Sequence, residues 1–427
     1  MLRNPTIQRI LKSTSIYTAG NFINRAIPFI LLPILTRFLC PEDYGILAIF
    51  IAVLGIIEIV ISMGVADAVV RNYLDREVRG FEFSAYVFNA FLINLLFFSI
   101  ITAFWLLSKA YLIKIIPIPF NYQLLIPLFG FLISVQTIPM RLLIMMKRPL
   151  PYITSHILVT SVEFILSVFF VVVLGLTWQG RIGGIFLSKI LFFIIGMAIL
   201  GKYKFFRCSL NLSYIKDILR YSSPIVLHSL GFVIIAAIDR FFLSKFINLS
   251  TVGIYSVSYS ACSIVAFFTL AFRQAISPFI YEKLKQPTLN LKIKLVKSTY
   301  LYFALMLAGM GLFIYFAPPL LNILVGKQFL GAKVFIFWLA LGFGFHAMYT
   351  MLTQYIFYQK KTHILSLVAL FTVILTIAAN YVLIKINGAI GVAQATCLVF
   401  LSRFLLVWYF SNRVYPMPWF SFARIKA

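Results

Sequence analysis

The stretch LLPILTRFLCPEDYGILAIF, residues 31–50, contains two apolar runs joined by a short polar segment that carries two carboxylates. Pro41 cannot continue a preceding helix, and Pro-Glu-Asp suits the first turn of a new helix, where acidic side chains meet the positive end of the helix dipole. Gly45 allows close packing just inside that helix. The stretch therefore predicts two apolar helices that meet at a tight turn.

The composition is that of a membrane protein. The 427 residues are 62% hydrophobic and 11% charged, with a mean hydropathy of +1.00. A soluble protein of this length keeps a larger polar exterior. Runs such as 159–176 and 364–384 are long enough to cross a hydrocarbon core of about 30 Å, and they lack the alternation of barrel strands. We therefore expect an all-α polytopic membrane protein.

Turn signals and charges divide the chain into about twelve predicted transmembrane helices. The predicted spans are 14–38, 44–67, 82–108, 122–146, 152–176, 181–201, 214–242, 253–275, 298–318, 333–357, 363–386 and 388–411. With the N-terminus inside, the inner segments hold 23 of the 37 Lys and Arg residues and the outer loops hold 9. This bias predicts that both termini are cytoplasmic. The basic start, residues 1–12, is expected to lead into an uncleaved first span.

The chain contains an internal repeat. Its echoes are TRFLCPEDYG (36–45) with DRFFLSKFINLSTVG (239–253), GRIGG (180–184) with GAIGV (388–392), and SHIL (155–158) with THIL (362–365). The offsets are 208 for the final glycine of the first echo, 208 for the second echo and 207 for the third. Two six-span halves, 1–207 and 208–427, are therefore predicted. An even number of spans makes the two bundles parallel, related by a pseudo-twofold axis along the membrane normal.

The segment 31–50, the twelve spans and the glycine echo together resemble the O-antigen flippases of the Wzx type. These belong to the polysaccharide-transporter branch of the multidrug/oligosaccharidyl-lipid/polysaccharide exporter superfamily. Cys40 stands where that family more often has Ser or Gly. The resemblance implies a flippase of the bacterial inner membrane, acting in polysaccharide, O-antigen or lipopolysaccharide biosynthesis. Its substrate would be undecaprenyl-diphosphate-linked oligosaccharide, moved from the cytoplasmic to the periplasmic leaflet by alternating access.

Several ionisable residues lie deep within the predicted spans, where a charge normally faces a cavity or a partner. These are Arg25, Glu58, Glu163, Lys189, His228 and His346. Arg25 is midway along the first span and has Asn21 and Asn24 beside it. Pro28 and Pro33 interrupt the same helix, and broken helices tend to line transport cavities. The first span is therefore predicted to contribute to a substrate cavity.

The repeat suggests which residues of the two halves match in depth. The 203-residue offset that aligns Arg37 with Arg240 places His228 opposite Arg25, and Lys189 adds a further positive charge. A diphosphate needs such groups to replace water inside a membrane, and arginine can bind it through two parallel hydrogen bonds. The predicted diphosphate- and sugar-binding residues are Arg25, Asn21, Asn24, Lys189 and His228.

Two acidic residues have two open interpretations. Glu58 and Glu163 lie at comparable depth in their spans, and each can carry a coupling proton or act as a fixed counter-ion for Arg25. The remaining charges near span ends are expected to be anchored at the interface or solvated. The expected interface anchors are Arg141, Arg273 and Arg403, and the expected solvated residues are Asp67, Asp239 and Arg240.

Other functions are less favoured. The charge of +26 follows from the basic inner loops, so no nucleic-acid partner is expected. Four scattered cysteines predict neither disulfides nor a metal site, and no cofactor is expected. No ATP-binding P-loop is present, so an ion gradient, mass action or a partner must supply energy. The expected partners besides the lipid-linked substrate are membrane lipids and, in the cell, a polysaccharide polymerase and chain-length machinery.

Two alternatives stay open at this point. A drug/cation antiporter of the same superfamily should present acids without deep bases, and Arg25 and Lys189 argue against it. An integral-membrane polysaccharide polymerase or transferase should carry a sizeable outer loop or a cluster of acids and histidines at one face. The short outer loops and dispersed histidines favour a carrier that is not an enzyme.

Overall fold

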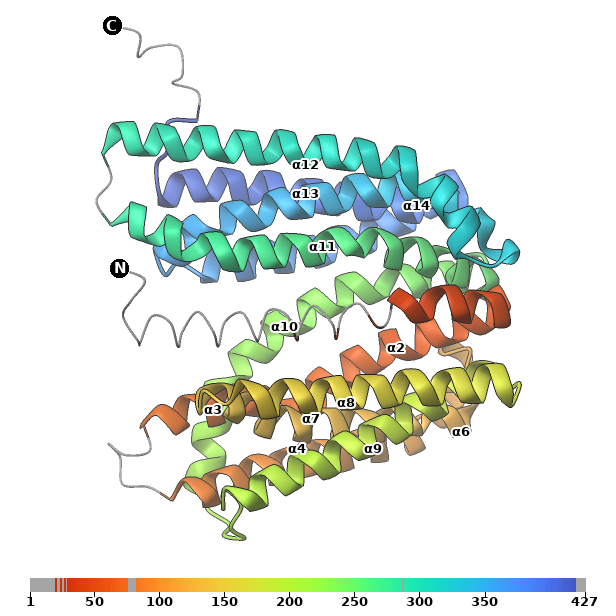
Figure 1. The fold of residues 1–427 in the computed structure, drawn as a ribbon. Helices are drawn as coiled ribbons and strands as arrows, with labels where there is room; N and C mark the ends of the chain where they lie inside the picture. The colour runs from red at the N-terminus through yellow and green to blue at the C-terminus, as the bar shows by residue number, and fades with distance from the viewer. Residues whose placement is uncertain are drawn as a thin grey trace, which may run out of the picture. The chain divides into compact units, whose positions relative to one another are not determined.

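The protein is described here by a computed structural model, and every regular element in its described residues is a helix. The described residues are 20, 24, 27, 29–75, 82–285 and 288–419. Contacts divide the chain into two compact units, Met1–Ala237 and Ile238–Ala427. The boundary falls inside α10 (Leu212–Phe246), which begins in unit 1 and ends in unit 2 (Figure 1). The repeat boundary at 207–208 stays a prediction.

Unit 1 is built around one buried helix, α7 (Leu125–Met145). The other elements of unit 1 are α2 (Pro41–Ser62), α3 (Val65–Asp75), α4 (Phe83–Leu107), α5 (Lys109–Ile115), α6 (Phe120–Gln123), α8 (Pro149–Val168), the π-helical turn η1 (Phe169–Val173) and α9 (Trp178–Lys202). Helix α7 contacts α2, α3, α4, α8 and α9. Its Ile126, Phe129 and Leu142 have no exposed surface, because these five helices pack against α7.

Unit 2 has the same plan. It contains α11 (Leu249–Leu284), α12 (Leu289–Leu324), the 3-10 turn η2 (Lys327–Ala332), α13 (Lys333–Tyr358) and α14 (His363–Val414). Helix α13 packs against α11, α12 and α14, which run alongside it in Figure 1. Helices α7 and α13 are each the fourth span of their predicted six. The same position is therefore central in both halves, as an internal repeat requires.

The helix starts in the first echo confirm the prediction made for residues 31–50. Helix α2 begins at Pro41, and the Sγ atom of the N-cap Cys40 accepts a hydrogen bond from Asp43 N at 3.4 Å. Helix α11 begins after Asn248, whose side chain accepts a hydrogen bond from Thr251 N at 2.8 Å. The two caps are 208 residues apart, which is the offset of the sequence echo.

The glycine echo also has a structural basis in both units. In unit 2, α14 contains a break at Gly388, which has φ 57° and ψ −139°. Asn380 and Thr396, eight residues on either side of Gly388, bind the same carboxylate, so α14 is a helical hairpin. A β-carbon at Gly391 would collide with the carbonyl oxygen of Leu383. The second echo thus marks the closest approach of the last two spans.

The predicted spans agree with the observed helices. Each of the eleven predicted spans from 44–67 onward overlaps a helix, with α14 accounting for two. Within the described residues, nine helices are long and apolar enough to cross a membrane. The described end of the first span, Phe29–Phe38, is a further apolar helix. The predicted all-α polytopic fold class is confirmed.

The packing at Gly184 generates a stability prediction. A β-carbon at Gly184 of α9 would lie 2.6 Å from Ser167 Oγ and 2.8 Å from Ser167 N on α8. At the neighbouring Gly183 the nearest atom, Phe170 Cδ2, lies at an ordinary 3.5 Å. We expect Gly184→Ala to destabilise the protein by about 1–3 kcal/mol, because backbone cannot yield as a side chain can.

The matched control is Gly183→Ala, which gains helix propensity and should leave the protein as stable or up to about 1 kcal/mol more stable. The measurement is the apparent melting temperature of each purified variant in detergent. Equal melting temperatures for the two variants would contradict the close approach of α8 and α9.

Candidate functional site

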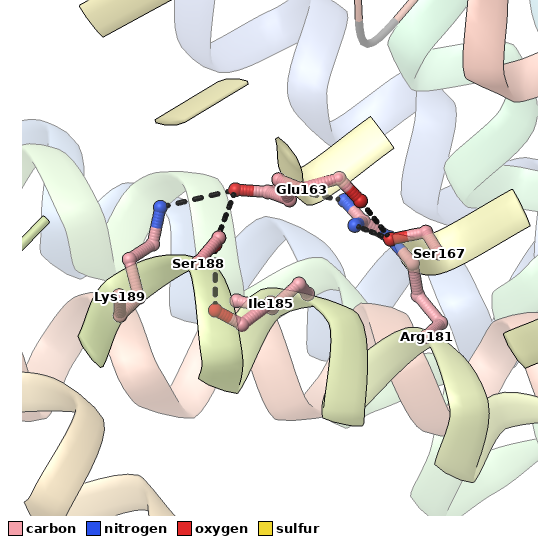
Figure 2. Close-up of polar contacts among 6 residues, drawn as sticks. All are labelled: Glu163, Ser167, Arg181, Ile185, Ser188 and Lys189. Carbon is pink, nitrogen blue, oxygen red and sulfur yellow. Dashed lines mark hydrogen bonds and ion pairs between the residues drawn. The ribbon is translucent and has the colours of Figure 1, made fainter. Parts of the chain in front are cut away.

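The main polar feature of unit 1 is an ion cluster between α8 and α9 (Figure 2). Glu163 of α8 lies between Arg181 and Lys189 of α9. Its Oε1 atom is 2.9 Å from Arg181 Nη2, and its Oε2 atom is 3.1 Å from Lys189 Nζ. The three side chains are only 19%, 11% and 21% exposed, respectively. One carboxylate thus holds two cations within a largely apolar bundle.

Two serines complete the cluster. Arg181 Nη1 donates to Ser167 Oγ at 2.6 Å, and Ser167 Oγ donates to the carbonyl oxygen of Glu163 at 2.5 Å. Ser188 Oγ lies 3.3 Å from Glu163 Oε2 and 2.7 Å from the carbonyl oxygen of Ile185, within hydrogen-bond reach of both. Residues at helical spacing lie on one face, so 163 and 167 of α8 meet 181, 185 and 188 of α9.

Local sequence brings the two helices together at this level. Gly184 lets the backbone of α9 approach Ser167, and Gly180 does the same beside Phe170. The π-helical turn η1 begins two residues after Ser167. Such turns are rare and are often found at functional sites. The glycines of the GRIGG motif therefore allow the close helix packing that brings the two cations of α9 to the carboxylate of α8.

Further titratable groups surround Lys189. Glu58 of α2 and His156 of α8 both lie within electrostatic range of its ammonium group. With Glu163 and Arg181, these described residues place two cations and two carboxylates in one region of unit 1. Buried ions need such compensation, because losing one partner leaves an uncompensated charge. An entering anion can compete with Glu163 for Lys189 without any bare charge being created.

The structure therefore brings together three of the predicted residues, Lys189, Glu163 and Glu58, and their roles stay predictions. Asn24 of the first span is described, and its Oδ1 atom is buried with no hydrogen-bond donor among the described residues. Asn21 and Arg25 lie outside the described residues.

His228 lies within α10, and its side chain is also outside the described part of the chain. The predicted pairing of Arg25 with His228 therefore stays a prediction.

Arg181 was missed by the sequence analysis, which made it the first residue of the predicted span 181–201 and did not count it among the deep residues. Helix α9 begins three residues earlier, at Trp178, and places Arg181 in its first turn facing α8. The available signal was its spacing from Ser188 and Lys189, seven and eight residues later on the same helix face. A boundary error of a few residues concealed that pattern.

The expectation that Asp239 is solvated is wrong. This α10 carboxylate is 1% exposed, because the α14 hairpin folds over it. It accepts hydrogen bonds from Tyr255 OH at 2.6 Å, Thr396 Oγ1 at 2.7 Å and Asn380 Nδ2 at 3.0 Å. Thr396 is 208 residues after Ser188. Equivalent hydroxyl positions in the two halves thus each face a buried carboxylate.

The expectation that Arg403 reaches the interface is also wrong. Arg403 is 2% exposed and its guanidinium lies 4.5 Å from the ring centroid of Tyr349. Arg141 instead pairs with Asp67, and both side chains are partly exposed. Within the described residues, no group of three or more His, Cys, Asp or Glu side chains could hold a metal ion.

The ion cluster generates a second stability prediction. Glu163→Gln should destabilise the protein by about 3–5 kcal/mol, because Arg181 and Lys189 are left as buried cations without their carboxylate. The matched control is Glu82→Gln. Its carboxylate pairs with Arg207, but the two side chains are 42% and 66% exposed, so a loss of about 0–1 kcal/mol is expected. Thermal unfolding in detergent measures both, and similar losses would contradict the buried character of the cluster.

Comparison with known proteins identifies a family and relatives that share this sequence pattern. Residues 10–284 match the family described as "Polysaccharide biosynthesis protein". Two curated proteins of Haemophilus influenzae are similar along most of their length. "Lsg locus putative protein 1" is 23% identical over 87% of this chain and 90% of its own. An "Uncharacterized membrane protein" is 24% identical over 87% of this chain and 89% of its own.

Solved structures show the same fold. An inward-facing multidrug resistance MATE family transporter of the MOP superfamily aligns with a TM-score of 0.73 and 15% identity, over 93% of this chain and 94% of its own. An outward-facing structure of such a transporter aligns with a TM-score of 0.62 and 18% identity, over 97% of both chains. The fold and the family point to a multi-pass membrane transporter rather than a catalyst. With its family match covering well over half of the sequence, this chain belongs to the polysaccharide biosynthesis protein family.

Proposed function

We propose that the protein is a flippase for undecaprenyl-diphosphate-linked oligosaccharide, an O-antigen or related repeat unit. It moves this substrate from the cytoplasmic to the periplasmic leaflet of the bacterial inner membrane, with both termini in the cytoplasm. Membership in the polysaccharide biosynthesis family and the transporter fold support this proposal. The observation that carries it is the pair of cations, Arg181 and Lys189, held on one carboxylate inside unit 1.

The chemistry of the cluster suits a diphosphate. Ammonium and guanidinium groups replace the water around phosphate oxygens, and their charge-assisted hydrogen bonds are about twice as strong as neutral ones. Without substrate, Glu163 neutralises Lys189 at 3.1 Å. On binding, Lys189 exchanges this carboxylate for a phosphate, while Arg181 keeps its bonds to Glu163 and Ser167. The exchange keeps each ion paired and so lowers the cost of charge within the membrane.

The first span supplies the other proposed ligands, Arg25, Asn21 and Asn24, and α10 supplies His228. A contact supports the position of the first span. A β-carbon at Gly20 would lie 2.5 Å from Ile153 Cγ2, so Gly20 of this span lies against α8, the helix that carries Glu163. The Oδ1 atom of Asn24, which has no donor among the described residues, then suits a sugar hydroxyl.

Transport follows by alternating access. The halves 1–207 and 208–427 close around the substrate from one side and open to the other, as rigid bodies do in such carriers. The polyprenyl tail stays in lipid throughout. Glu58 and Glu163 are the proposed sites of ion coupling or charge compensation. The polysaccharide polymerase and the chain-length machinery are proposed to receive the product on the outer side.

The test is leaflet-resolved detection of undecaprenyl-diphosphate oligosaccharide in cells that lack the gene. We expect completed units to accumulate on the inner leaflet and wild-type protein to clear them. Lys189→Gln and Arg25→Ala should slow clearance by about tenfold or more, since a hydrogen bond to a charged group contributes about 1.5–3 kcal/mol. Lys202→Gln is the matched control, because it removes an exposed lysine from the last turn of the same helix.

Three results would contradict the proposal. Normal clearance by well-expressed Lys189→Gln and Arg25→Ala would show that these cations do not bind the substrate. Single units left unpolymerised on the outer leaflet would indicate the membrane enzyme instead. An unchanged pool of lipid-linked units in the deletion strain would favour a drug/cation antiporter, because the similar solved structures are those of multidrug resistance MATE family transporters.

A further inference from the structure

A second group of basic side chains lies at one level inside unit 2. Arg273 is 11 residues before the end of α11, His346 is 12 before the end of α13, and Arg403 is 11 before the end of α14. The C-terminal ends of these three helices share one apolar cluster that includes Leu284, Ile356 and Val407. The helices therefore end on the same side, and the three basic residues lie about 16 Å from those ends at 1.5 Å rise per residue.

Two of these side chains lie against one aromatic ring. The Arg403 guanidinium lies 4.5 Å from the ring centroid of Tyr349, and the His346 ring is stacked on the same tyrosine at 5.7 Å. His346 is also within electrostatic range of both Arg403 and Arg273. Its Nδ1 atom is buried and has no hydrogen-bond partner among the described residues. One turn beyond Arg273, Ser277 donates to Gln354 at 2.8 Å, which extends the polar region toward the helix ends.

The arrangement concentrates positive charge in a part of the chain that is poor in acids. Residues 238–427 contain 17 Lys and Arg but only two carboxylates, Asp239 and Glu282. Asp239 accepts three hydrogen bonds from Tyr255, Thr396 and Asn380, and Glu282 is exposed near the end of α11. Two guanidinium groups that both lie within electrostatic range of one imidazole repel each other in a low dielectric. A multivalent anion between them converts this repulsion into attraction.

We propose that Arg273, His346 and Arg403 form a phosphate-binding site inside unit 2. Guanidinium groups match phosphate oxygens with two parallel bonds, and the unpartnered Nδ1 of His346 adds a hydrogen bond. The ligand is the phosphate group of a lipid, supplied either by a polyprenyl diphosphate or by the headgroup of an anionic phospholipid. Only the polyprenyl source rests on the proposed function. The site itself stands independently of the cluster around Glu163, which lies in unit 1.

The test is isothermal titration calorimetry on the purified full-length protein in a nonionic detergent. The probes are farnesyl diphosphate, a short polyprenyl diphosphate, and dioctanoyl phosphatidylglycerol. Arg273→Gln and Arg403→Gln should each weaken binding of at least one probe by about tenfold, while Arg403→Lys should weaken it less. Arg413→Gln is the matched control. It removes an exposed arginine from the same helix whose guanidinium also lies over a tyrosine, at 4.9 Å from the Tyr409 centroid.

The outcomes of the titration distinguish the two sources of the phosphate group. A loss confined to farnesyl diphosphate supports the site with a polyprenyl ligand, and a loss confined to phosphatidylglycerol supports it with a membrane phospholipid. Wild-type affinity for both probes in Arg273→Gln and Arg403→Gln would overturn the proposal. If Arg403→Gln does not fold, the half-buried Arg273 carries the test alone. Because binding is measured without transport, this result is distinct from the outcome of the cellular flippase experiment.

Discussion

A charge inside an apolar helical bundle has to be compensated, and this constraint organises unit 1. Glu163 binds Arg181 and Lys189 at once, so α8 and α9 must approach closely at this level. Gly184 permits that approach, and a β-carbon there would meet the backbone of Ser167. The same constraint explains why Glu58 lies in range of Lys189. The buried cations that suit a transported phosphate are thus the ones that tie the helices together.

Unit 2 meets the same constraint with different residues. Asp239 is compensated by three neutral donors rather than by two cations, and Thr396 occupies the repeat position of Ser188. The repeat therefore preserves the architecture, with a central fourth helix and a glycine-dependent contact between the last two spans, while the chemistry of each interior has diverged.

The fold was largely predictable because apolar runs indicate membrane spans, and proline and glycine indicate the turns between them. Pro41 and Gly388 both mark helix boundaries where they were expected. The deep position of Lys189 and Glu163 was also predictable from the span boundaries, because lipid excludes isolated charges. Their mutual contact was not, since helix rotation and neighbours are set by packing. Arg181, Asp239 and Arg403 were misplaced for the same reason. Arg181 and Asp239 lie near predicted span ends, Arg403 lies eight residues inside one, and only the tertiary fold buries them.

The most direct test exchanges the charges of one ion pair. The variant Glu163→Lys with Lys189→Glu keeps an opposite-charge pair between α8 and α9 but moves the ammonium group to the other helix. The double variant leaves Arg181 beside an ammonium group, so our account predicts that it regains only part of the melting temperature lost by either single variant, while clearance of lipid-linked oligosaccharide stays defective. Recovery of both stability and transport would contradict the account, because the pair would then serve only to hold the two helices together.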